Sequence, residues 1–155
     1  MREGDVARGF LEGEAPAAIT CPTAEEALRE LRAITAEAVI LQDAAEELLF
    51  AIRDRRPLAE LAPRGGPMIS RFLELKARLV ESADTDVRRY TTVLRAVFDH
   101  HALVLSSSLD LLAVDWRSEA VLRQLEKIDG LGPPAQWLEA VRSELVARTE
   151  PLLTA

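Results

Sequence analysis

Apolar residues recur at intervals of three and four along two long stretches of the sequence, and this spacing predicts amphipathic helices. The first stretch begins with a capping-box pattern, in which Thr23 and Glu26 are placed to bond each other's backbone. Pro57 prevents the helix from continuing much beyond Arg55. We therefore predict a helix over residues 24–55. The apolar face of this helix carries Leu31, Ile34, Ala38, Leu41, Ala45, Leu48 and Ile52.

The second long stretch, residues 86–114, shows the same periodicity and contains the two histidines of the chain, His100 and His101. A cluster of polar residues around Asp84 is typical of a break in the chain followed by the N-cap of this helix. At 100° per residue, His101 falls near the centre of the apolar face, whereas His100 falls at its border. The stripe that includes His101 consists of Tyr90, Leu94, Val97, His101, Val104, Ser108 and Leu111.

The remaining segments predict shorter helices separated by glycine and proline. Residues 57–67 contain Gly65, Gly66 and three prolines, so we predict a loop there, with at most one helical turn. Gly130 suits the left-handed position after a helix, and Pro151 is expected to stop the last one. These helices are expected over residues 68–83, over residues 116–129, and from Pro134 to about Arg148 with Trp137 turned inward.

Together these patterns predict an all-α protein, an antiparallel bundle of about five helices, because strand periodicity is absent from the sequence. We expect residues 1–22 to form a partly flexible N-terminal arm, residues 23–150 a single domain, and residues 151–155 a tail. The two long helices are about twice the length of the others, so part of each apolar stripe should stay uncovered. That geometry favours a homodimer.

Composition narrows the classes of function. The chain has 155 residues and a net charge of −7, which disfavours binding to nucleic acid. Its single cysteine, Cys21, excludes an internal disulfide framework. The N-terminus lacks the apolar segment of a secretory signal, and residues 102–114 are too short to span a membrane. We therefore expect a cytoplasmic protein with no membrane partner.

His101 is the strongest candidate for a site. A buried neutral imidazole needs both a donor and an acceptor, and its own helix offers neither within reach. The simplest interpretation is a core histidine bonded to a neighbouring helix. The alternative is a ligand pocket lined by Tyr90, His101 and Ser108, with His100 at its edge. Metal binding is not expected, because the positions three and four residues away hold no ligands.

The sequence shows no catalytic constellation, so we expect no catalytic residues and no cofactor. Our leading hypothesis is a non-enzymatic helical module for protein–protein interaction or regulation, whose partner is another protein or a second copy. A small-molecule-binding bundle with a pocket beside His101 is the alternative. A histidine phosphotransfer-like bundle that uses His100 is third, because the flanking residues lack the motifs of such domains.

Overall fold

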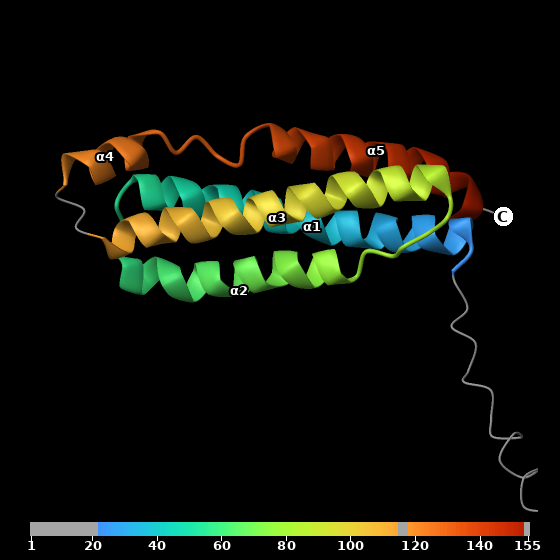
Figure 1. Cartoon of the computed structure of the whole chain (residues 1–155), viewed down its shortest axis with the longest axis horizontal. Helices are drawn as coiled ribbons and strands as arrows, with labels where there is room; N and C mark the ends of the chain where they lie inside the picture. Colours follow the sequence, from blue (N-terminus) through green and yellow to red (C-terminus); the bar gives the residue numbers. More distant parts are fainter. Residues whose placement is uncertain (1–21, 115–117, 154–155) are drawn as a thin grey trace, which may run out of the picture.

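The computed structural model describes residues 22–114 and 118–153, and these residues contain helices and no strand (Figure 1). The all-α prediction is confirmed. The predicted N-terminal arm lies outside these ranges except for Pro22. The described helices are α1 (Ala24–Arg53), α2 (Leu58–Ala77), α3 (Thr85–Ala113), α4 (Glu119–Glu126) and α5 (Pro133–Leu153).

Helix α1 begins with the predicted capping box, since Thr23 accepts from the backbone of Glu26 and the Glu26 carboxylate accepts from that of Thr23. It ends at Arg53, two residues before the predicted end. Arg55 takes a left-handed conformation (φ 61°), and its N–H bonds the carbonyl of Ile52. The N–H of Arg56 reaches back five residues along the chain. This is a Schellman termination with arginine in the position that glycine usually occupies.

Helix α2 corrects the prediction of a loop over residues 57–67 and a helix over residues 68–83. Leu61 and Gly65 are buried, so the apolar stripe that includes Phe72 extends two turns further towards the N-terminus. Pro63 and Pro67 have no backbone N–H to donate, so the carbonyls four residues before each of them lose their helical partner. Both carbonyls belong to exposed residues, where water can replace that partner. Burial of this stripe therefore outweighs the two prolines, and the helix ends at Ala77.

A side chain at Gly65 would collide with the neighbouring helices. A Cβ atom there would lie 2.5 Å from Leu109 Cδ1 and 3.2 Å from Leu48 Cδ2, whereas one at Gly66 would meet nothing within 4 Å. Gly65 therefore marks a close approach of α2 to α1 and α3. The glycine pair that suggested a turn is a packing feature of a helix.

Helix α3 matches the predicted rod closely. The Asp84 carboxylate caps it by accepting from the N–H of Val87 at 3.0 Å. Its buried positions include Tyr90, His101 and Ser108, as the angular analysis predicted. The face predicted from the sequence is therefore the face that packs.

The C-terminal helices differ from the prediction in three respects. Helix α5 continues through Pro151, because that proline lies in the last turn and deprives only the exposed Ala147 carbonyl of its helical donor. Trp137 is 51% exposed rather than inward, since Leu138 takes the buried position beside it. Helix α4 covers only eight residues of the predicted 116–129 segment.

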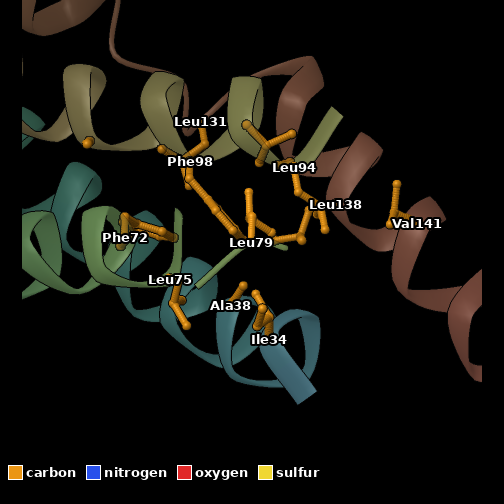
Figure 2. Packing of buried hydrophobic residues seen from close by; sticks show 14 of the residues in the cluster. Ile34, Ala38, Phe72, Leu75, Leu79, Leu94, Phe98, Leu131, Leu138 and Val141 are labelled. Atoms are coloured by element: carbon orange, nitrogen blue, oxygen red, sulfur yellow. The ribbon is translucent and has the colours of Figure 1, made fainter. Parts of the chain in front are cut away.

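The long helices enclose one core. Figure 2 shows Ile34 of α1, Phe72 of α2, Leu94 of α3 and Leu138 of α5 turned towards the same interior. Arg32, in the first half of α1, bonds to Thr149 near the end of α5, and Gln42, further along α1, bonds to Ala135 at the start of α5, so these two contacts follow opposite order along the chain (Figure 1). Among the described helices, none is long and apolar enough to cross a membrane.

Candidate functional site

His101 is completely buried and bonds to α1. Its Nε2 lies 2.7 Å from Oε1 of Gln42, which is itself only 4% exposed. The Gln42 amide group donates in turn to the carbonyl of Ala135, in the first turn of α5, at 3.2 Å. Because the amide oxygen faces the ring, Nε2 of His101 must carry the hydrogen and donate it. The partner comes from a neighbouring helix, as expected, but it is a side-chain amide.

The other ring nitrogen of His101, Nδ1, is buried without a hydrogen-bond partner in the described structure. The edge of the ring packs against Phe72, with 5.2 Å between the ring centroids. Burial, with a smaller contribution from the neighbouring His100, lowers the pKa of His101 to about 4. The ring is therefore neutral at physiological pH, and Nδ1 keeps an unshared electron pair inside the core.

His100 bonds to the connection between α4 and α5. Its Nε2 donates to the carbonyl of Leu131 at 2.9 Å, and its ring lies 5.9 Å from that of His101. The two histidines and Gln42 therefore hold this connection and the start of α5 against α3 and α1. A phosphoryl acceptor needs an available ring nitrogen, and Leu131 engages one of the two in His100.

Tyr90 belongs to a different network at the other end of α3. Its hydroxyl accepts from Nη1 of Arg148 at 3.1 Å, and Arg148 also pairs with the Asp86 carboxylate at 2.9 Å. The Tyr90 hydroxyl and then Asp86 raise the pKa of the Arg148 guanidinium above its ordinary value. This network joins α5 to the start of α3.

Ser108 faces a groove between α3 and α4 with a volume of about 490 Å³. From Tyr90 to Ser108 the rise along α3 is about 27 Å, so the predicted pocket residues do not surround one cavity. Only Ser108 of the four candidates lines this groove; the two histidine rings lie together and do not line it. The α3–α4 groove is lined by Leu103, Val104, Ser107, Ser108, Leu111, Gln124, Lys127, Ile128, Asp129 and Gly130.

The sequence interpretation missed Leu103, which is 65% exposed at this groove. It lies four residues after Asp99, on the polar side of α3 opposite the stripe that carries His101. A leucine on a polar face was the available signal. The α4 side of the groove gave no comparable signal, because it depends on how the 127–130 segment turns back towards α3.

The described residues contain no group of three or more histidine, cysteine, aspartate or glutamate side chains that could hold a metal ion. The groove is lined by leucine, valine and isoleucine side chains with hydroxyl, amide, ammonium and carboxylate groups beside them. The comparison with known proteins adds no assignment: no protein-family model, no curated protein and no solved structure matches this chain.

Proposed function

We propose that this protein is a non-enzymatic helical interaction module that self-associates through the α3–α4 groove. The observation that carries the proposal is the exposure of Leu103, 65%, beside a groove of about 490 Å³ with apolar walls. Apolar side chains exposed next to a concave apolar surface are typical of interaction sites. The groove supplies the concave surface and Leu103 supplies the projecting apolar side chain that such a contact needs.

A second copy of the chain fits this surface for a geometric reason. In a twofold contact the same patch occurs on both partners, so Leu103 of each copy can enter the groove of the other. Complete burial of a leucine side chain contributes about 1.5–3 kcal/mol, and the symmetry doubles this contribution. Lys127 and Asp129 also line the groove, so each copy can offer the other an opposite charge.

The net charge of −7 opposes self-association at long range. Salt screens the repulsion between two acidic copies much more than it affects the burial of leucine. We therefore expect the dimer to become tighter as the salt concentration rises. A contact held mainly by ion pairs would instead become weaker as the salt concentration rises.

Sedimentation equilibrium over a concentration series tests the proposal. The wild-type chain should dimerise in the micromolar range, and Leu103→Lys should be monomeric. Ile40→Lys is the matched control, because Ile40 is 73% exposed on α1 and does not line the groove. A monomeric wild-type chain, or equal loss of the dimer in both variants, would refute the proposal.

A small-molecule ligand is the second candidate, and the position of Ser108 favours it. The Ser107 and Ser108 hydroxyls, the Gln124 amide and the Lys127 ammonium lie beside the apolar wall. Few polar groups in an apolar concavity are characteristic of ligand sites. Native mass spectrometry separates the candidates: a monomer that retains a small molecule supports the ligand, and a ligand-free dimer supports self-association.

A further inference from the structure

A second, polar cavity lies where the α2–α3 connection meets the first half of α3. Its volume is about 210 Å³, less than half that of the α3–α4 groove. It is also smaller than the pockets that usually hold drug-sized ligands, about 300 Å³ and more. The cavity is lined by Glu81, Ser82, Arg88, Thr91, Thr92 and Arg95.

Two arginines provide the positive charge of this cavity. Arg88 and Arg95 are seven residues apart on α3, a rise of about 10 Å, and so lie on the same side of the helix. Neither forms an ion pair within the described ranges, although Arg71, Arg78 and Arg148 each pair with carboxylates. Their guanidinium groups are therefore available to an anion in the cavity.

Hydroxyl groups complete the set of donors. Ser82 Oγ accepts from the backbone N–H of Asp84 at 3.1 Å, which leaves its own hydrogen available to donate. The hydroxyls of Thr91 and Thr92 both donate to the carbonyl of Arg88, at 3.0 and 2.8 Å. Because that carbonyl can keep one donor while losing the other, either threonine can turn its hydrogen towards a ligand.

We propose that this cavity binds a phosphate group, as inorganic phosphate or as the head of a small phosphate monoester. Guanidinium groups bind phosphate oxygens through paired charge-assisted hydrogen bonds, and hydroxyls satisfy the remaining oxygens. The cavity is too small for a nucleotide to be enclosed, so the ligand is a small anion. Glu81, which also lines the cavity, opposes the anion and weakens its binding.

Isothermal titration calorimetry of the full chain at constant ionic strength tests this site. Inorganic phosphate and phenyl phosphate are titrated separately against a chloride background. Arg88→Gln and Arg95→Gln should each weaken binding about tenfold or more, because each removes a charge-assisted contact. Glu81→Gln should tighten binding by about threefold to tenfold, because it removes a repelling charge.

Arg142→Gln is the matched control, because Arg142 is an exposed arginine on α5 that does not line the cavity. It should leave binding unchanged, and thermal unfolding should show that all the variants fold. Binding of phenyl phosphate at least as tight as that of phosphate identifies an ester as the ligand class, and preference for phosphate identifies the free ion. Absence of binding to the wild-type chain, or equal weakening by the Arg142 control, would overturn the proposal.

Discussion

The buried imidazole of His101 should make the stability of this protein depend on pH. In the folded chain burial lowers the pKa of His101 from 6.5 to about 4. The unfolded chain therefore binds a proton at pH values where the folded chain does not, so acid favours unfolding. The contribution is fully present above pH 6.5 and is lost as the pH falls towards 4.

The magnitude follows from the size of the shift. A difference of about 2.5 pKa units corresponds to about 3 kcal/mol of unfolding free energy, all of it lost below pH 4. At pH 5 the unfolded state is nearly saturated with the proton and the folded state is mostly neutral. The loss there, relative to pH 8, is about 2 kcal/mol.

The assay compares the wild-type chain with His101→Gln by urea denaturation, followed by circular dichroism, at pH 8 and pH 5. Glutamine does not titrate, and its amide can donate to Gln42 as Nε2 does. The carboxylates are common to both proteins, so the difference between their pH dependences isolates His101. A difference below about 0.5 kcal/mol would refute the reasoning, because the loss expected from protonation of His101 in the unfolded chain is about fourfold larger.

Nitrogen NMR of the wild-type ring gives an independent check that does not depend on the variant. It should show the Nε2–H tautomer, which the bond to Gln42 requires, persisting to about pH 5. A ring that is doubly protonated at pH 6 would contradict both the burial and the hydrogen-bond assignment. Such a result would show that the core opens to water at this position.

Three further predictions concern stability and can be measured by denaturant unfolding. Gly66→Ala should raise the free energy of unfolding by about 1 kcal/mol, because alanine has the higher helix propensity. Gly65→Ala should be about 1–3 kcal/mol less stable than Gly66→Ala, because its methyl group would be overpacked against the neighbouring helices. Equal effects of the two substitutions would contradict the close approach of the helices at Gly65. Arg55→Gly should stabilise by about 1 kcal/mol, because glycine adopts the left-handed conformation without steric cost; a loss would mean that the arginine side chain contributes more. His101→Leu and Gln42→Leu should each lower the free energy of unfolding by about 1–3 kcal/mol, because each leaves its partner unsatisfied. The double variant should lose less than the sum of the two, because neither partner is left unsatisfied in it. Strict additivity would show that the two side chains are not coupled.

The local features of the fold were predictable from sequence because local chemistry determines them. The capping box at Thr23, the Asp84 cap and the inward position of His101 all follow from spacing within one helix. Gln42 was predictable in principle: it lies four residues after Ala38 and three before Ala45, inside the apolar stripe. A polar residue in that position indicates a buried partner.

The errors arose where contacts between helices outweigh local preference. Two glycines and three prolines favour a loop over residues 57–67, but Leu61 and Gly65 bury their stripe against α1 and α3. The exposure of Trp137 depends on the rotation of α5 about its axis, which its sequence leaves ambiguous between adjacent apolar residues. The α3–α4 groove likewise depends on tertiary placement, because Gln124 of α4 and the 127–130 segment after it supply one of its walls.

We infer that the buried polar network favours one register of this bundle over others. Leucine and alanine faces pack almost equally well after a shift of one helical turn, about 5.4 Å. Such a shift would separate His101 from Gln42 and leave both unsatisfied in the core, which penalises the alternative register. His100 extends this control to the α4–α5 connection through Leu131, next to the residues that form one wall of the groove. We infer that the histidine pair, which the sequence suggested as the lining of a site, helps to position the surface that we propose for self-association.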